Sequence, residues 1–442
     1  MRAFLSKAAQ WAKNNRFVAH ALRYHPLYYP AAAAVFKSIA AADGADKKAR
    51  IETLLRRTLA RARTPDYGRG KPLDISAWPI LEKDLIHSAP QRFITASWPR
   101  LPASTSGSSG FPLKLVRSVS NYGAEQAAHD YLFLAAGCIF RTSRVAILRG
   151  DNIKNPSDVT PPFWSARDKQ TLVFSFPHLT PSTSLLFLKK LEEFNPDILW
   201  VYPTSGDALA RYLLESGKTL PGVKVLFSSS EMLAPNSWPR WQQAFPQAIV
   251  LDYYSQAERV CLSYQRTADT AWFVPAYGYV ELLPDAITLE TPENLRSARV
   301  IATGFWNPAM PLVRYETGDR ILYPRSYTDA DLEAVALGDK PFTRVLGRLS
   351  EYLITPQGGQ IQAINNIPYE VEHLERVQFI QSSPSSVEIR CAVLPGFSAL
   401  DAEKLLVNAR KKIPATIDVR IVTDKPLEKM TNGKTPFVIR QC

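Results

Sequence analysis

The sequence of 442 residues has little cysteine and no long hydrophobic run. Its four cysteines stand singly, without a Cys-x-x-Cys pair or a nearby histidine cluster, which argues against a disulfide framework or a structural zinc site. The longest apolar runs are too short to span a bilayer, and no run of five basic residues suggests nucleic-acid binding. We therefore expect a cytoplasmic protein with no transmembrane segment and no nucleic-acid partner.

A net positive charge is the clearest feature of the composition. The chain has 53 lysines and arginines against 41 aspartates and glutamates, a formal charge of +12. Such a surface attracts acidic partners, including a nucleotide, an anionic lipid or an acidic carrier protein. Residues 3–18 also carry apolar side chains at helical spacing beside basic ones. This pattern favours a helix packed on the protein's own body, and a helix resting on a membrane surface is the alternative.

The order of apolar segments predicts a layered α/β fold. A helical opening extends to about residue 63, and strand-like runs then alternate with helical patterns at 181–194 and 205–216. Such alternation is typical of a parallel sheet covered by helices, with ligands bound at the carboxyl ends of the strands. The expected strands of this sheet are Val145–Leu148, Leu172–Phe176, Ile198–Tyr202, Val223–Phe227 and Ile249–Tyr254.

Two smaller units are expected after this sheet. Short strands between residues 277 and 323 predict an antiparallel or barrel-like subdomain. Beyond residue 346, strand and helix patterns form a final unit, in which Ser398 and Asp401 make a capping box for a helix. The predicted fold class is α/β. It has a large N-terminal domain, residues 1–348, with parallel sheets covered by helices plus a barrel-like subdomain, and a small mobile α+β C-terminal domain, residues 349–442.

Residues 104–110 form the most distinctive segment of the chain. They hold five hydroxyl side chains and two glycines in seven positions. Glycines let the backbone approach an anion closely, while hydroxyl and N–H groups donate hydrogen bonds to phosphate oxygens. The segment lacks the Gly-Lys-Ser/Thr ending of a Walker A loop, and by composition alone a flexible linker is an equally good interpretation. The residues of this candidate phosphate loop are Ser104, Thr105, Ser106, Gly107, Ser108, Ser109 and Gly110.

Four further segments follow the loop in a specific order. Together with the loop they resemble the adenylate-forming superfamily, and within it the phenylacetate–CoA ligase and CapK-like branch. The resemblance covers roughly residues 25–440. The four segments are Asp252-Tyr253-Tyr254-Ser255-Gln256-Ala257-Glu258, Arg314-Tyr315-Glu316-Thr317-Gly318-Asp319, Leu346-Gly347-Arg348 and Lys429-Met430-Thr431-Asn432-Gly433-Lys434.

The resemblance implies a ligase that uses ATP and Mg²⁺. In such enzymes a carboxylate attacks the α-phosphate of ATP, which gives an acyl-adenylate and pyrophosphate, and a thiol then displaces AMP. It implies that Glu258 binds Mg²⁺ and acts in catalysis, that Asp319 binds the ribose, and that Lys434 is the catalytic lysine. It also implies nucleotide contacts from the candidate phosphate loop, from Arg348 at the domain hinge, and from Ser229, Ser230, Glu231, Tyr253, Tyr254 and Ser255, with Tyr254 on the adenine face.

The sequence departs from the family pattern at three positions. Phe111 stands where many members carry lysine, Ser255 where glycine is usual, and Ser350 where an aspartate commonly acts as the hinge pivot. Adenylation remains the prediction, because Lys114 is available for the phosphate contact and Glu351 for part of the hinge role.

The acyl substrate is only weakly encoded. The branch resemblance favours a small aromatic acid of the benzoate, hydroxybenzoate or phenylacetate type. The pocket candidates are Tyr131 and Phe133, His178, which stands where some relatives place a pocket histidine, and Ser228 at a strand end. The acceptor is either coenzyme A or the phosphopantetheine arm of an acidic acyl carrier protein, since both present the same thiol and a basic protein suits both.

Two interpretations from other classes stay open. One is a non-catalytic nucleotide-binding protein on a ligase scaffold, which would bind ATP without releasing pyrophosphate. Glu258, Asp319 and Lys434 argue against it, because their side chains supply the chemistry of adenylation. The other is a basic protein associated with a membrane surface, which would bind anionic vesicles in a salt-dependent way. The sequence does not determine the oligomeric state.

Overall fold

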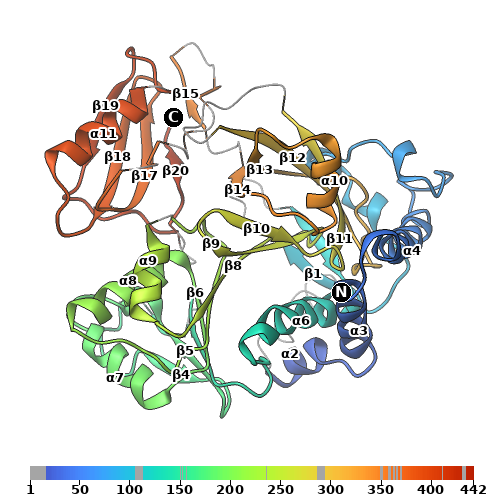
Figure 1. Cartoon of the computed structure of the whole chain (residues 1–442), viewed down its shortest axis with the longest axis horizontal. Coiled ribbons are helices and arrows are strands. Elements are labelled where there is room, and N and C mark those ends of the chain that lie inside the picture. The colour runs from blue at the N-terminus through green and yellow to red at the C-terminus, as the bar shows by residue number, and fades with distance from the viewer. Residues whose placement is uncertain are drawn as a thin grey trace.

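The computed structural model shows an α/β protein with three sheet-centred units (Figure 1). Within the part of the chain that it describes, no helix is both long enough and apolar enough to cross a membrane. The predicted helix at residues 3–18 lies almost entirely outside this part, which begins at residue 16. The described residues are 16–104, 113–149, 151, 153–155, 157–234, 236–285, 294–348, 352–356, 360–361, 364, 367–368, 371–410, 412–430 and 435–442.

The largest unit is an eight-stranded sheet with the order β10-β9-β8-β7-β6-β3-β5-β4. The pairs from β5 through β3, β6 and β7 to β8 are parallel, as the alternating sequence pattern predicts, while both edges are antiparallel. The strands are β3 (Val145–Leu148), β4 (Trp164–Ala166), β5 (Thr171–Phe174), β6 (Ile198–Val201), β7 (Val225–Ser229), β8 (Ile249–Ser255), β9 (Leu262–Thr267) and β10 (Thr270–Phe273).

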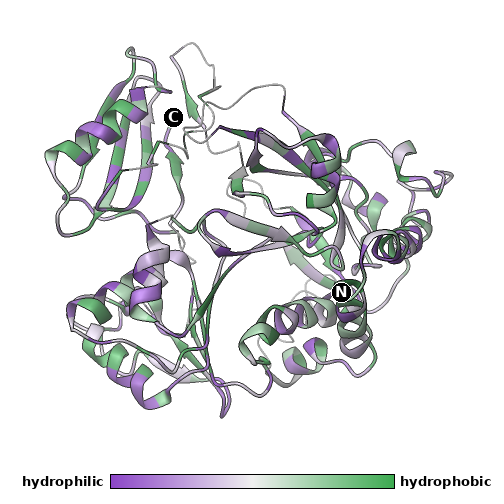
Figure 2. Cartoon of the chain, in the orientation of Figure 1, coloured by the Kyte–Doolittle hydropathy of each residue, from purple (hydrophilic) through white to green (hydrophobic). Residues whose placement is uncertain are grey.

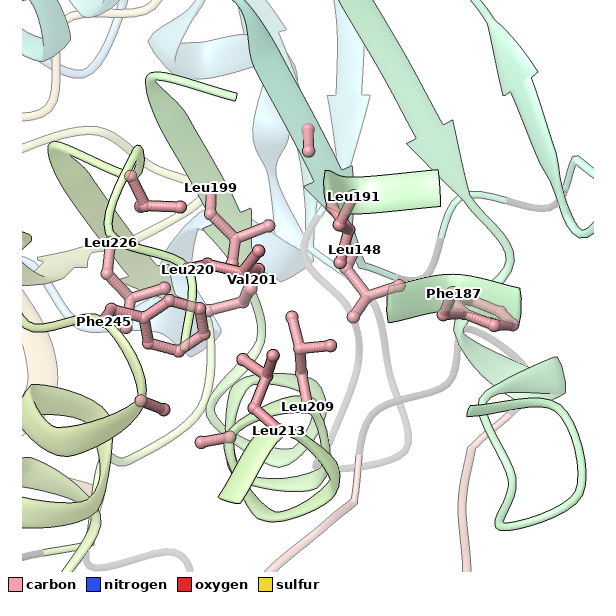
Figure 3. Packing of buried hydrophobic residues seen from close by; sticks show 14 of the residues in the cluster. Leu148, Phe187, Leu191, Leu199, Val201, Leu209, Leu213, Leu220, Leu226 and Phe245 are labelled. Carbon is pink, nitrogen blue, oxygen red and sulfur yellow. The ribbon is translucent and has the colours of Figure 1, made fainter. Parts of the chain in front are cut away.

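Helices cover both faces of this sheet because its buried strands present apolar side chains on each side. Leu226 of β7 packs in the core beneath α7, α8 and α9, and its neighbour Phe227 packs in the opposite core with α3 and α6. Figure 3 shows the first core, in which Leu199 and Val201 meet Leu209 and Leu213 of α8. The helices are α2 (Arg16–Arg23), α3 (Tyr28–Ala40), α4 (Gly44–Ala62), α6 (Val119–Phe133), α7 (Ser184–Phe194), α8 (Pro203–Glu215) and α9 (Ser237–Ala244).

The second unit is an antiparallel sheet with the order β11-β12-β13-β14. It corresponds to the predicted barrel-like subdomain, and its residues Val300, Ile321 and Tyr323 form a separate buried core. A short hairpin flanks the candidate phosphate loop. The elements of this region are β1 (Leu101–Ser104), β2 (Lys114–Arg117), α5 (Lys83–Ser88), β11 (Gly278–Pro284), β12 (Leu295–Gly304), β13 (Tyr315–Pro324), α10 (Asp329–Ala336) and β14 (Arg344–Arg348).

The C-terminal unit has its own sheet, with the order β19-β18-β17-β20, and its own apolar core. The predicted capping box is confirmed, because Ser398 Oγ accepts from the Asp401 amide and the Asp401 carboxylate accepts from the Ser398 amide. The helices around all three units carry both hydrophilic and hydrophobic residues, as helices with one buried face do (Figure 2). The elements are β15 (Leu353–Ile354), β16 (Gln360–Ile361), β17 (Leu374–Ser383), β18 (Ser386–Val393), α11 (Ala399–Arg410), β19 (Asp418–Val422) and β20 (Val438–Arg440).

The predicted fold class, a multidomain α/β protein, is confirmed. The boundary proposed between residues 348 and 349 stays a prediction, since residues 349–351 lie outside the described part. The separate core of the C-terminal unit is consistent with a boundary in that region.

Candidate active site

A cavity of about 690 Å³ lies at the carboxyl ends of the parallel strands. Trp200 of β6, Ser229 of β7 and Tyr253 of β8 contribute to its wall from neighbouring strands. Asp319 of β13 contributes from the antiparallel sheet, and His129 from α6. The fold therefore brings residues from distant parts of the sequence to the position where open parallel sheets bind ligands.

Tyr254 and Asp319 form a direct pair in this cavity. The Tyr254 hydroxyl donates to Oδ2 of Asp319 at 2.8 Å, although β8 and β13 belong to different sheets. The Asp319 amide donates to the hydroxyl of Thr317 at 3.0 Å, which fixes the backbone at this point. Burial, and next the adjacent Asp319 carboxylate, raise the pKa of Tyr254, so its hydroxyl keeps its proton as a donor.

Glu258 is 5% exposed and lines the same cavity. Its Oε1 accepts from the Tyr315 hydroxyl at 2.6 Å, whereas its Oε2 is buried without a hydrogen-bond partner among the described residues. Within that part of the chain, no three side chains of the usual ligand types converge to hold a metal. The Glu258 carboxylate is therefore suited to give one oxygen ligand to a cation whose other ligands are phosphate and water oxygens.

The polar segment after β7, Glu231 included, also lines the cavity. Ser229 Oγ accepts from the Trp200 indole at 3.2 Å, and Ser230 has the left-handed φ of 75°. The Glu231 carboxylate, which we expected to contact nucleotide, is held by protein groups. Its Oε2 accepts from Thr204, and its Oε1 accepts from the amide of Thr435 at 3.0 Å.

A buried ionic network extends from Glu231 into the C-terminal unit. Arg376 of β17 lies 3.4 Å from the Glu231 carboxylate and 3.6 Å from that of Asp207 on α8. Arg211 of α8 and Arg240 of α9 meet Glu375, the residue before Arg376, at 2.9 and 3.4 Å. We call these six side chains, Asp207, Arg211, Glu231, Arg240, Glu375 and Arg376, the interdomain network. Because they are largely buried, their pairing holds the C-terminal unit in one orientation.

A second polar group was not anticipated from the sequence. Glu125 of α6 lies 3.4 Å from Arg259 and accepts from the hydroxyls of Tyr253 and Tyr277. Burial alone would raise the pKa of Glu125, but Arg259 and these donors lower it to about 2. Burial lowers the pKa of His129 to about 4, so that its ring is neutral at pH 7. The packing of α6 on the face of the large sheet, which a local sequence pattern does not contain, places Glu125 beside Tyr253.

The four residues that we predicted for the acyl pocket are not among those that line this cavity. Phe133 is fully buried in the core behind His129, and Tyr131 packs against Phe36. His178 is 4% exposed, bonds to Ser175 and stacks on Phe163 beneath α7. These aromatic side chains therefore serve the core. Phe133 lies four residues after His129 on α6, and both rings pack against Phe227. Ser228, also predicted for the pocket, is buried within β7 beside Asp252.

The remaining predicted site residues fall partly outside the described structure. Ser104 lines the cavity, so the candidate phosphate loop begins there. Tyr253 and Ser255 line it as well, with the Ser255 hydroxyl donating to the Cys261 carbonyl. Arg348 ends β14 and pairs in register with Asp319. Several positions with predicted roles lie outside the described residues: Thr105, Ser106, Gly107, Ser108, Ser109, Gly110, Ser350 at the hinge, and Lys434.

No protein-family model matches the chain. Among curated proteins, Protein CapK of Staphylococcus aureus is 22% identical over 361 residues, which cover 79% of this chain and 75% of that protein. Among solved structures, 2-hydroxyisobutyryl-CoA ligase in the postadenylation state with 2-HIB-AMP has a TM-score of 0.59 at 16% identity, covering 90% of both chains. The same enzyme with 2-HIB-AMP and CoA in its thioesterification state has a TM-score of 0.50 at 17% identity, again covering 90% of both.

These comparisons confirm the fold expected from the sequence motifs. The chain has the fold of adenylate-forming CoA ligases, and its similarity to CapK agrees with the CapK-like branch of that superfamily.

Proposed function

We propose that the protein is an ATP-dependent acid–thiol ligase. In the first half-reaction a carboxylate oxygen attacks the α-phosphorus of ATP, and the bond to the bridging oxygen of the β-phosphate breaks to release pyrophosphate. In the second, a thiolate sulfur attacks the acyl carbon, and the carbon–oxygen bond to AMP breaks. The observation that carries the proposal is the convergence of Ser104, Tyr254, Glu258 and Asp319 on one cavity at the sheet edge.

The nucleotide roles follow from the chemistry of each contact. Asp319, held by Tyr254 and by its own backbone, presents a charged acceptor suited to two ribose hydroxyls. Ser104 begins the hydroxyl-rich loop that would hold the β- and γ-phosphates, and Ser229, Ser230, Tyr253 and Ser255 border the same space. Arg348, in register with Asp319, would contact the ribose or phosphates.

Magnesium would rest on the free oxygen of Glu258 and neutralise charge on the transferring phosphates. A Glu258→Gln variant should need a higher Mg²⁺ concentration for half-maximal activity, because a hard cation loses a charged oxygen ligand. The measurement is the Mg²⁺ dependence of pyrophosphate release at saturating ATP. Glu316→Gln, which affects a carboxylate paired with Arg299 on the adjacent strand, is the matched control. Superimposable titration curves for the wild type and Glu258→Gln would remove the metal assignment.

Two further proposals concern the acyl substrate and the thiol acceptor. We propose a small aromatic acid, because the aromatic side chains of Trp200 and Tyr253 line the cavity in place of the aromatic residues first expected. Coenzyme A and an acidic carrier protein are both proposed as acceptors, since a formal charge of +12 attracts either. The solved ligase with the fold of this chain binds CoA, which supports the first of them.

The C-terminal domain is proposed to move between the half-reactions. Thr435, which follows the proposed catalytic Lys434, is bonded to Glu231 at the cavity, so the present orientation suits adenylation. The higher TM-score to the postadenylation state than to the thioesterification state of one solved ligase supports this interpretation. A pantetheine arm must later approach the same acyl carbon, which requires a second orientation.

Removing Arg376 should separate the two half-reactions. Arg376→Ala deletes the side chain that joins Glu231 and Asp207, so adenylation should fall about tenfold, in line with the ~1–2 kcal/mol of an ion-pair contact. Transfer from preformed acyl-AMP to the thiol should change less than about twofold. Arg376→Lys should restore part of the adenylation rate. The matched control is Arg390→Ala, whose partners Glu388 and Glu428 lie within the C-terminal unit. Equal losses in both half-reactions would contradict this role.

The proposed function as a whole is tested with a panel of carboxylic acids. Each is incubated with ATP and Mg²⁺, and pyrophosphate release is measured before and after addition of coenzyme A or a holo carrier protein. At least one acid should stimulate pyrophosphate release, and the thiol should raise turnover. ATP binding without acid-dependent release across the panel would favour the non-catalytic alternative, and salt-sensitive binding to anionic vesicles would favour the membrane-surface one.

A further inference from the structure

Two arginines that line the cavity have no anionic partner in the described structure. Arg23, at the end of α2, and Arg149, directly after β3, both line the cavity. Neither makes a salt bridge or a hydrogen bond to another described residue, and the Nε of Arg149 is buried. The Arg149 guanidinium carbon lies over the Trp200 ring, 4.5 Å from its centre. We call Arg23 and Arg149 the arginine pair.

The carboxylates near the arginine pair are already engaged. Glu125 is held by Arg259 and two tyrosine hydroxyls, and Asp151 lies 3.1 Å from Arg167. Burial lowers the pKa of Arg23, and the neighbouring Arg167, Arg259 and Arg149 lower it further, which reports an excess of positive charge here. His129 adds no negative charge, and burial raises the pKa of Asp252 to about 7, which keeps much of it neutral at neutral pH.

Arg149 lies away from Tyr254, which is proposed to bind the nucleotide. In the sheet, β8 carries Tyr254, and β7 and β6 separate it from β3, which leads to Arg149. Three strand spacings amount to roughly 14 Å. His129 lines the cavity as well, and its ring packs edge-on against those of Trp200 and Tyr253. An acid that reacts at the nucleotide end would therefore extend toward the arginine pair.

Guanidinium groups stay charged at all physiological pH values, and a charge that is taken out of water without a partner is costly. A cavity that keeps two such groups without an anionic partner among the described residues is suited to an anion with carboxylate-like oxygens, which arginine binds in a bidentate manner. We propose that the acyl substrate carries a second anionic group, and that Arg23 and Arg149 bind this group while the reacting carboxylate faces the nucleotide. This inference rests on the proposed function and specifies its substrate class.

The test compares acids that differ by one anionic group. Benzoate is compared with isophthalate, and butyrate with glutarate, in acid-dependent ATP–pyrophosphate exchange without coenzyme A. The wild type should prefer the diacid of a pair by at least about tenfold in kcat/KM, as expected for a charge-assisted contact. Arg149→Gln should lose about tenfold on the diacid and less than about twofold on the monoacid, while Arg149→Lys keeps part of the preference. Arg23→Gln should behave like Arg149→Gln.

The control is Arg141→Gln, an exposed arginine that stacks on Tyr24 outside the cavity and should leave the preference unchanged. A preference for monoacids, or equal losses on both acids in Arg149→Gln, would overturn the proposal. It would also be overturned if Arg149→Gln raised the KM for coenzyme A in transfer from preformed adenylate and left both acids unaffected, because the pair would then bind the coenzyme's phosphates.

Failure of the proposed function can be separated from failure of this inference by a binding measurement. The melting temperature of the protein is recorded with each acid in the absence of ATP. If no acid supports exchange, the ligase function fails. The inference still holds if the diacid alone raises the melting temperature of the wild type and not that of Arg149→Gln, and it fails if the diacid gives no such difference.

Discussion

Replacing Lys434 with alanine should reduce acyl-adenylate formation at least about 100-fold while leaving ATP affinity within a few-fold of the wild type. The lysine is proposed to meet the negative charge that builds at the α-phosphate, and loss of one such electrostatic contact typically costs ~3–4 kcal/mol in the transition state. Thr435, the next residue, is anchored to Glu231 at the cavity, so we expect Lys434 within reach of the reacting atoms.

The measurement is ATP–pyrophosphate exchange, together with the Kd for ATP. Lys425→Ala is the matched control, because this lysine pairs with Glu388 in the same C-terminal unit and should not affect adenylation. A second readout is transfer from preformed acyl-AMP to the thiol, which the Lys434 variant should retain. Exchange within a few-fold of the wild type would show that Lys434 is not the catalytic lysine.

Replacing Asp319 with alanine should raise the KM for ATP about 100-fold. Two hydrogen bonds from ribose hydroxyls to a charged acceptor contribute ~1.5–3 kcal/mol each, and the variant loses both. It also leaves the buried Tyr254 hydroxyl without the carboxylate to which it donates at 2.8 Å. Asp319→Asn, which keeps the shape and loses the charge, should show an intermediate effect.

The measurement is the KM and kcat for ATP of the wild type and both Asp319 variants, at a fixed, saturating concentration of the acid. Asp331→Ala, which removes a carboxylate paired with Lys340 in the same subdomain, controls for general destabilisation. A nucleotide lacking the 2′-hydroxyl should lose less affinity on the Asp319 variant than on the wild type, because the contact is already absent. A KM for ATP within twofold of the wild type would argue that Asp319 only supports β13.

The fold class could be predicted from the sequence because strands and helices leave local patterns of apolar residues. The buried strand Val145–Leu148 was predicted with the bounds that the structure has, since a run of apolar residues between polar ones allows few alternatives. Other strands shifted by a few residues, as for β7, which begins at Val225 and ends at Ser229. Ends of elements depend on hydrogen bonding to neighbouring strands, which a local pattern does not contain.

The sequence predicted site residues correctly only where several motifs followed one another in a specific order along the chain. Tyr254, Glu258 and Asp319 converge on the cavity, in agreement with their linked order in the sequence. The prediction of a pocket was wrong for Tyr131, Phe133 and His178, which do not line the cavity. Aromatic residues next to a sheet are as well suited to a core as to a pocket. The contact of Glu231 with Arg376 joins residues 145 positions apart and has no local signature.

The central claim is that a carboxylate oxygen attacks the α-phosphate of ATP at this cavity. It is tested most directly with an acid whose carboxylate is labelled with ¹⁸O, incubated with ATP, Mg²⁺ and coenzyme A, followed by mass spectrometry of the products. The proposed reaction leaves one labelled oxygen on AMP, because the bond that breaks in the second half-reaction joins that oxygen to the acyl carbon. Label in inorganic phosphate or pyrophosphate, or AMP without label, would contradict the account.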